Sequence, residues 1–295
     1  MRRVLVIRHG AFGDIVLTFA AFAAIRAHHN EAQITLMTTK PFAGFLGCAP
    51  WFDELVVDDK PEWWNLPGLL RLRRQLSWFD MVYDLQTSGR SSRYFALAGR
   101  PAWSGIARGC AFPDINPERG EIHARERLAG QLAAAGVTMP LSEPELGWLS
   151  GDISALNLPP RYVVLVPGAA PHRPEKRWPA AYFKELGQGL ELPFVVVGTR
   201  SEANLAAKIG GIDLTGQTDF WQLASVLRGA EFAVGNDTGP MHLAAALGTR
   251  CVSLFSGDSD PARAAPRYPD GGWPSILRAP HLAALPVAQV RAALP

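Results

Sequence analysis

Short apolar runs recur along the first half of the chain, and segments with helical spacing separate them. Runs rich in β-branched residues are typical of buried strands, whereas apolar residues three and four positions apart indicate a helix. We predict strands at 4–7, 34–39, 55–58 and 81–85. We predict helices between and after them, at 14–29, 62–78, 91–98 and 121–135, the last ending before Gly136.

The pattern stops between Met139 and Arg161, where four prolines and two glycines leave no long periodic segment. We interpret this stretch as a linker. Beyond it, strands are predicted at 162–166, 194–198, 213–214, 232–234 and 251–255. Helices are predicted at 179–190, 202–209, 220–227, 240–247 and, at the end of the chain, 286–294.

Strands that alternate with helices predict parallel β-α-β units, and hence the α/β class. Because a Pro-rich stretch separates two such halves, we predict two Rossmann-like parallel-sheet domains, residues 1–150 and 151–295, facing a central cleft. In sheets of this kind ligands bind beyond the carboxyl ends of the strands.

The composition adds limits to this picture. With 295 residues, 48% hydrophobic and 19% charged, the chain suits a soluble protein of one large or two medium domains. A net charge of +2 gives no global support for nucleic-acid binding. Three widely spaced cysteines suggest a reduced, cytosolic setting, and the first apolar run is too short for a signal peptide. The longest mainly apolar stretch, 15–25, is too short to span a bilayer.

Charge is unevenly distributed. Residues 71–108 contain seven arginines against Asp80 and Asp84, and residues 53–62 contain five acids against Lys60. Two solvated faces would explain this, and so would a basic rim that recognises an anionic partner.

The stretch GNDTGPMHLAAALG (235–248) places polar residues where a strand meets a helix. Pro240 suits the first helical turn, so we expect free N–H groups at Met241 and His242 beside the positive end of the helix dipole. Such a helix start is an anion site, to which Thr238 adds a hydroxyl and Gly239 a close backbone approach. Alternatively, Asp237 and Thr238 only cap the helix.

A basic loop follows the strand at 162–166. In PGAAPHRPEKRWP (167–179), His172, Arg173, Lys176 and Arg177 offer up to four cationic groups at the carboxyl end of a strand. Together with the helix start at 239, they suggest a diphosphate whose charge grows as it leaves. A solvated basic loop is the alternative.

Two acidic residues follow strand ends. Glu202, just past the strand at 194–198, can accept hydrogen bonds from ribose hydroxyls, or can simply favour a helix start. Asp14, in RHGAFGDIVLT (8–18), is either a helix N-cap or a general base. The glycines Gly10 and Gly13 do not complete a dinucleotide fingerprint, which disfavours an oxidoreductase.

These motifs, in this order, resemble glycosyltransferase family 9, the ADP-heptose:lipopolysaccharide heptosyltransferases. The resemblance extends over nearly the whole chain. It rests on VLVIRHGAFGDIVLT, YDLQTSGRSSRYFALAGRPAWSGI, HARERLAGQLAAAG, PGA…EKRWP, GTRSE, GNDTGPMHLAAALG and LFSGDSDP.

The resemblance implies a GT-B fold and an inverting, metal-independent transfer of heptose from ADP-heptose to a lipopolysaccharide inner-core acceptor. No metal or other cofactor is implied, despite Asp258-Ser259-Asp260. The same likeness implies a lipid-linked oligosaccharide acceptor. The cysteines favour a cytoplasmic location, and the net charge favours no nucleic-acid partner. The likeness leaves open a peripheral contact with the inner face of the cytoplasmic membrane.

Roles carry over by position. The resemblance makes Asp14 the catalytic base, Lys176 the contact to the donor phosphate and Glu202 the ribose ligand. It places Asp237 at the heptose hydroxyls. The turn Asp237-Thr238-Gly239, with Met241 and His242, then binds the donor. In the N-terminal, acceptor-side half, we expect Arg90 and Arg93 to recognise anionic groups of the acceptor.

The chain departs from the family in two places. Ala169, Ala170 and Pro171 stand where family members often carry hydroxyl residues, and only 34 residues follow LFSGDSDP. Two alternatives therefore stay open: a transferase that uses another nucleotide-sugar for a different surface glycan, and a non-catalytic GT-B-like binding protein.

Overall fold

The computed structural model describes residues 1–140, 143–169 and 173–295. The chain forms two compact units, Met1–Leu141 and Ser142–Pro295, each of which is described by itself. Each unit contains one six-stranded sheet in which every pairing is parallel. The predicted α/β class and its two parallel sheets are confirmed.

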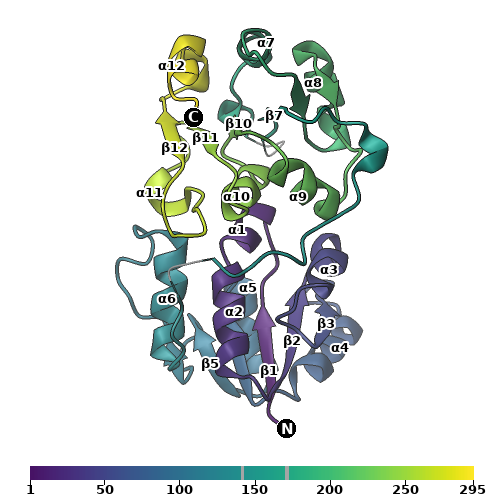
Figure 1. The fold of residues 1–295 in the computed structure, drawn as a ribbon. Coiled ribbons are helices and arrows are strands. Elements are labelled where there is room, and N and C mark those ends of the chain that lie inside the picture. Colours follow the sequence, from purple (N-terminus) through teal and green to yellow (C-terminus); the bar gives the residue numbers. More distant parts are fainter. Residues whose placement is uncertain (141–142, 170–172) are drawn as a thin grey trace. The chain divides into compact units, whose positions relative to one another are not determined.

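The first unit has the strand order β3-β2-β1-β4-β5-β6. Its strands are β1 (Arg3–Ile7), β2 (Gln33–Thr38), β3 (Glu54–Val57), β4 (Met81–Asp84), β5 (Ala102–Gly105) and β6 (Phe112–Pro113). Its helices are α1 (Phe12–Val16), α2 (Phe19–His28), α3 (Lys40–Gly47), α4 (Leu66–Leu76), α5 (Gly89–Leu97) and α6 (Ala124–Ala134). Helices α2 and α6 pack together, as do α4 and α5 (Figure 1).

The second unit repeats this order as β12-β11-β10-β7-β8-β9. Its strands are β7 (Val163–Val166), β8 (Phe194–Val196), β9 (Ile212–Asp213), β10 (Ala233–Asn236), β11 (Cys251–Phe255) and β12 (Ser275–Arg278). Its helices are α7 (Ala180–Gln188), α8 (Ala203–Ile209), α9 (Phe220–Arg228), α10 (Gly239–Ala246), α11 (Pro261–Ala264) and α12 (Val287–Ala292). Short 3-10 helices are η1 (Ser154–Leu156), η2 (Pro174–Lys176), η3 (Arg200–Glu202) and η4 (Leu282–Ala284).

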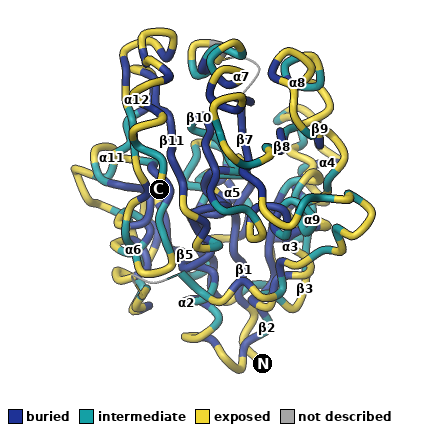
Figure 2. Tube along the Cα trace, turned by 45° about the horizontal axis from the view of Figure 1, so that its top comes forward, coloured by how far each residue is buried: buried dark blue, intermediate teal, exposed yellow. Residues whose placement is uncertain are grey.

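Both orders are those of a doubly wound Rossmann sheet, in which the order of strand addition reverses between the first and fourth strands while all strands stay parallel. The reversal lies between β1 and β4 in the first unit and between β7 and β10 in the second. These strands are almost wholly buried, which explains their continuous apolar runs (Figure 2). Each unit has its own apolar core, one around Trp103 and Tyr94, the other around Trp178 and Phe183.

The predicted helix 14–29 is two helices. The Thr18 hydroxyl donates to the Asp14 carbonyl at 2.6 Å, and the Thr18 N–H donates to Ile15. The second bond spans three residues and not four, so the backbone forms a tighter turn between Val16 and Phe19, and the hydroxyl bond favours a bend at the same place.

Strands β5, β6 and β12 and helix α3 were not predicted, because their segments are short or rich in glycine and proline. The predicted linker is partly attached to the second unit. The Arg228 guanidinium donates to the carbonyls of Leu146 and Leu149, and the Gly151 N–H donates to Ser225. These bonds explain why the second unit begins at Ser142, earlier than the predicted residue 151.

Candidate active site

Asp237 is the centre of a polar cluster in the second unit, directly after β10. Its Oδ2 lies 2.7 Å from Lys176 Nζ and accepts a hydrogen bond of 2.7 Å from the Ser259 hydroxyl. His242 Nε2 lies 3.6 Å from the other oxygen, Oδ1. Since Lys176 follows β7 and Asp237 follows β10, the cluster lies at the reversal of strand order, where ligands bind in this architecture.

The electrostatics of Asp237 follow from its neighbours. Burial alone would raise the pKa of its carboxyl group, but the hydrogen bond and charge of His242, and then those of Lys176, hold this pKa well below its usual range. His242 is buried, and its Nδ1 has no hydrogen-bond partner among the described residues. The cluster therefore contains a fixed carboxylate, an ammonium group and a buried imidazole nitrogen that has no hydrogen-bond partner among the described residues.

Asn236 holds these groups together, and sequence reasoning missed it. Its buried amide donates to the carbonyls of Pro167 at 2.8 Å and Gly168 at 3.3 Å. Its Oδ1 accepts from the Trp178 N–H at 3.0 Å. The end of β10 is thereby fixed to both ends of the basic loop, which places Lys176 beside Asp237.

The start of α10 differs from the prediction in its backbone. The N–H groups of Met241 and His242 are not free, because both donate to the Thr238 carbonyl, at 3.1 and 3.3 Å. The Met241 side chain is fully buried and packs beneath Gly235. Thr238 stands at the N-cap position, yet its hydroxyl makes no capping hydrogen bond. The groups left for a ligand at this helix start are thus the Thr238 hydroxyl and the N–H of Gly239, for which the described residues provide no acceptor.

Glu202 lies at the carboxyl ends of β7 and β8, between two glycines. Its Oε2 accepts from the N–H of Thr199 at 2.7 Å and from its hydroxyl at 3.1 Å. A Cβ on Gly168 would lie 1.9 Å from Oε1, and one on Gly198 would lie 2.6 Å from Oε2. Both glycines therefore make room for this carboxylate, and Oε1 remains available to a further donor.

The rest of the basic loop is only partly described. Arg173 is exposed, and the Arg177 guanidinium donates to the Ala169 carbonyl at 3.1 Å, so it stabilises the loop. His172, Ala170 and Pro171 lie outside the described residues.

Asp14 lies on the first turn of α1, after β1 of the first unit. Its Oδ2 accepts from the Ala11 N–H at 3.1 Å, so it caps the helix from the third helical position and not as the N-cap. The turn before it requires glycine, since Gly10 has a φ of +127° and a Cβ there would meet the Phe42 ring at 2.6 Å. The Asp14 side chain is 50% exposed, which leaves its Oδ1 accessible to a ligand.

Two arginines near Asp14 were not singled out from the sequence. The buried Arg8 guanidinium donates to the carbonyls of Leu85 and Asp14 and lies 3.6 Å from Asp14 Oδ1. Arg127 on α6 is half-buried. Burial and the charge of Arg119 lower its pKa, while Asp14 and Asp114 act in the opposite direction. Asp14 is thus a carboxylate flanked by positive charge.

A buried polar group, also missed, links three elements of the first unit. Asp58 Oδ2 lies 3.0 Å from His9 Nε2 and accepts from the Tyr94 hydroxyl at 2.7 Å. Burial would raise the pKa of Asp58, but the hydrogen bonds from His9, Tyr94 and the Lys60 N–H hold it below its usual value. Asp58 is therefore buried and does not belong to the solvated acidic face that the sequence suggested for residues 53–62.

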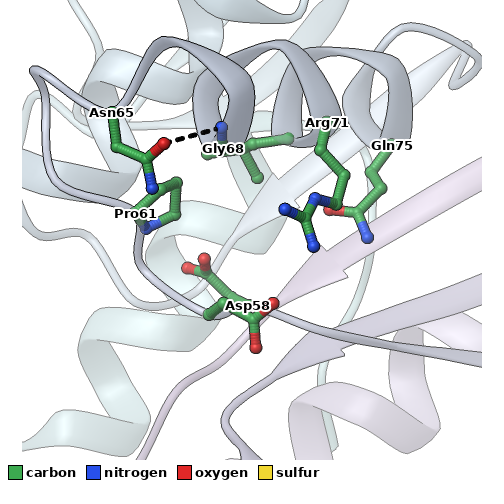
Figure 3. Close-up of a pocket in the computed structure, with 8 residues that line it drawn as sticks. Asp58, Pro61, Asn65, Gly68, Arg71 and Gln75 are labelled. Atoms are coloured by element: carbon green, nitrogen blue, oxygen red, sulfur yellow. Dashed lines mark hydrogen bonds between the residues drawn. The ribbon is translucent and has the colours of Figure 1, made fainter.

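A small polar cavity of about 120 Å³ opens beside Asp58 (Figure 3). Arg71 and Gln75 point into it from α4, and Asn65 caps that helix by accepting from the Gly68 N–H at 3.0 Å. The remaining lining residues are Asp59, Pro61, Gly68 and Leu72.

Arg90 and Arg93 lie together on α5, as their spacing requires. Their guanidinium carbons lie 5.0 and 5.1 Å from the centre of the Trp63 ring, a cation–π arrangement. Arg90 also donates to the Pro61 carbonyl at 3.0 Å. Asp260, of the Asp-Ser-Asp stretch, caps α11 by accepting from the Ala262 N–H.

Comparison with known proteins assigns the chain to a family. The model of "Glycosyltransferase family 9 (heptosyltransferase)" matches residues 69–271, more than half of the chain. Lipopolysaccharide heptosyltransferase 1 of Salmonella typhimurium is 34% identical over 288 residues, covering 88% of this chain and 89% of that protein.

Solved structures agree in fold. A family 9 glycosyl transferase from Veillonella parvula has a TM-score of 0.82 at 21% identity, covering 99% of this chain and 95% of its own. E. coli heptosyltransferase WaaC with ADP-2-deoxy-2-fluoro heptose has a TM-score of 0.74 at 21% identity, covering 98% of each chain. These matches confirm the GT-B fold. The family model and the Salmonella typhimurium relative show that the chain belongs to glycosyltransferase family 9, the heptosyltransferases.

Proposed function

We propose that this enzyme transfers a heptose from ADP-heptose to a lipopolysaccharide inner-core acceptor, with inversion and without a metal ion. The observation that carries the proposal is the Lys176–Asp237–His242 cluster, with Glu202 at a neighbouring strand end. It is supported by the relatives, one named as a lipopolysaccharide heptosyltransferase and one bound to an ADP-heptose analogue.

The second unit is proposed to hold the donor. Glu202 Oε1 accepts hydrogen bonds from the ribose, the Thr238 hydroxyl and the Gly239 N–H donate to the diphosphate, and Lys176 neutralises it. Asp237 binds heptose hydroxyls, and His242 Nδ1 provides a further hydrogen bond. Met241 is not part of this proposal, because its N–H is already bonded and its side chain is buried.

In the proposed reaction Asp14 takes the proton of the attacking acceptor hydroxyl. The acceptor oxygen forms a bond to the anomeric carbon from the face opposite ADP, and the bond between that carbon and the phosphate oxygen breaks. ADP leaves with the electron pair, and Lys176 stabilises the charge that develops on it. Arg90 and Arg93 recognise anionic groups of the acceptor, and the Arg8 guanidinium, 3.6 Å from Asp14 Oδ1, helps to orient the Asp14 carboxylate.

Asp14→Asn tests the chemical role. A general base contributes roughly 10²- to 10⁴-fold, so turnover should fall by that factor while ADP affinity, measured by calorimetry, stays unchanged. Asp59→Asn, an exposed carboxylate of the same unit, is the matched control. Unchanged turnover in Asp14→Asn would remove Asp14 from the mechanism.

The donor is tested separately with a panel of nucleotide-sugars. ADP-heptose should raise the melting temperature more than uridine or guanosine diphosphate sugars do. Preference for a uridine or guanosine donor would favour a transferase for another surface glycan. Donor binding without any transfer would favour a binding protein.

A further inference from the structure

The segment 63–79, which contains α4, carries an unusual concentration of exposed apolar side chains. Trp64, Leu66, Leu70 and Trp78 are 80%, 68%, 57% and 68% exposed. Of the eight large apolar residues exposed among the described residues, these four lie within fifteen positions. Isolated exposed apolar residues are common, but a group of this kind indicates an interaction surface.

Packing of α4 does not account for these residues. The helix is held to the core of the first unit by Gly68, Leu72 and Leu76, which recur every four positions along its buried face. Leu66, Leu70 and Arg74 have the same spacing on the opposite face, where all three are exposed. The outer face of α4 is therefore apolar at its start and basic toward its end.

The charge of the segment has one sign. Between Trp63 and Phe79 there are three arginines, Arg71, Arg73 and Arg74, and no acidic residue. In the part of the chain that the structure describes, no carboxylate forms an ion pair with any of them. Arg71 points into the cavity beside Asp58, so the positive charge available to an anionic partner is that of Arg73 and Arg74.

We infer that this face of α4 binds the surface of an anionic phospholipid bilayer. Leucines that enter the acyl boundary, arginines that meet lipid phosphates and tryptophans at the headgroup level are the marks of an interfacial helix. Here Trp64 precedes the helix and Trp78 follows it. None of the described helices combines the length and apolar character that crossing a bilayer requires, so the contact is peripheral.

The choice of a bilayer rests in part on the proposed function, in which the acceptor is lipid-linked. Helix α4 packs against α5, which carries the proposed acceptor residues Arg90 and Arg93. The Arg90 guanidinium donates to the carbonyl of Pro61, which leads into the segment. Docking through α4 would bring these arginines to the surface in which the acceptor is embedded.

The test is flotation of the full chain with vesicles that contain no acceptor, made of phosphatidylcholine with or without 30% phosphatidylglycerol. The protein should float with anionic vesicles, and salt should weaken the binding. R73Q/R74Q should lower the partition constant by about five-fold per charge, or roughly 25-fold. L66Q/L70Q should lower it on the order of ten-fold. K184Q/K208Q and I115Q, which remove exposed charges and an exposed apolar residue elsewhere, should change nothing.

The outcomes separate this inference from the proposed function. L66Q/L70Q should lose transfer to acceptor in vesicles but keep transfer to a delipidated acceptor. If the protein binds vesicles but transfers nothing from ADP-heptose, the proposed function is wrong and the bilayer assignment stands. Absence of flotation, or flotation unchanged in both double variants, would overturn the bilayer assignment. A dimer in sedimentation velocity that L66Q/L70Q abolishes, with no vesicle binding, would instead assign the face to a second copy.

Discussion

At the scale of single residues, the site depends on carboxylates whose surroundings differ. Asp237 is nearly buried but meets Lys176 and His242, so it stays charged. Asp14 is half exposed and is flanked by arginines. Asp84, at the end of β4, is buried, and its Oδ2 has no hydrogen-bond partner in the described part of the chain. Burial raises the pKa of Asp84 to about 6, although hydrogen bonds from Thr87, Ser91 and Gln86 act against it.

This pKa predicts a stability that depends on pH. In the unfolded chain an aspartate titrates near pH ~4, so folded Asp84 binds a proton that the unfolded chain has released between about pH 4 and 6. The contribution of Asp84 to the free energy of unfolding is therefore fully present below about pH 4 and is lost as the pH rises through 6. Relative to Asp84→Asn, the native protein should lose roughly 2–3 kcal/mol of unfolding free energy between pH 4 and 7. Urea unfolding of both proteins across this range measures the difference.

Asp59→Asn is the control for this experiment, because Asp59 is exposed. Its free energy of unfolding should depend on pH in the same way as that of the native protein. A constant difference between native protein and Asp84→Asn from pH 4 to 7 would contradict the raised pKa.

At the scale of elements, strand ends and the turns that follow them arrange the donor site. The turn after β7 contains Gly168, and the 3-10 helix after β8 contains Glu202. These two turns meet because β7 and β8 are adjacent parallel strands. The close approach of the Glu202 carboxylate to Gly168 therefore follows from strand pairing.

Gly168→Ala should move Glu202 and leave the fold intact. The added Cβ would lie 1.9 Å from Oε1, the end of a flexible side chain, which can swing away at little cost. Loss of a charge-assisted hydrogen bond costs about 1.5–3 kcal/mol, so calorimetry should find ADP affinity lower by roughly 10- to 100-fold. The melting temperature of the free protein should change little.

The matched variant is Gly147→Ala, where an added Cβ meets nothing within 4 Å. It should preserve ADP affinity. Both changes act on the same contact, so the double variant Gly168→Ala/Glu202→Gln should bind ADP no more weakly than Glu202→Gln alone. If the losses of ADP affinity in the two single variants added up in the double variant, Gly168 would not act through Glu202.

At the scale of the whole molecule, the chain consists of two complete sheets with separate cores. No strand of one sheet pairs with a strand of the other among the described residues. Lys176, Glu202 and Asp237 all belong to the second unit. A unit with its own core and its own ligand residues is expected to fold and bind independently.

Residues 142–295 produced alone should therefore melt cooperatively and bind ADP with an affinity close to that of the full chain. A fragment 162–295 should be less stable, because it lacks the buried Leu149 and the carbonyls that bond Arg228. Thermal unfolding and calorimetry on both fragments measure this. An unfolded 142–295 fragment would contradict the independence of the unit.

The sequence by itself determined the alternation of strands and helices, the α/β class and the positions of the main polar motifs. These are local properties, since apolar spacing and turn residues act over a few positions. The strand-turn-helix at 233–246 was predicted for this reason. The likeness to family 9 also came from ordered local motifs.

The tertiary structure alone decided which polar groups meet. The pairs Asn236–Trp178, Asp237–Lys176 and Asp58–Tyr94 join residues 58, 61 and 36 positions apart. Strand order creates these contacts, and no local spacing encodes it. The same long-range packing buried Asp58 and Asp84, and a tight turn at Thr18 divided a helix that the apolar spacing predicts as continuous.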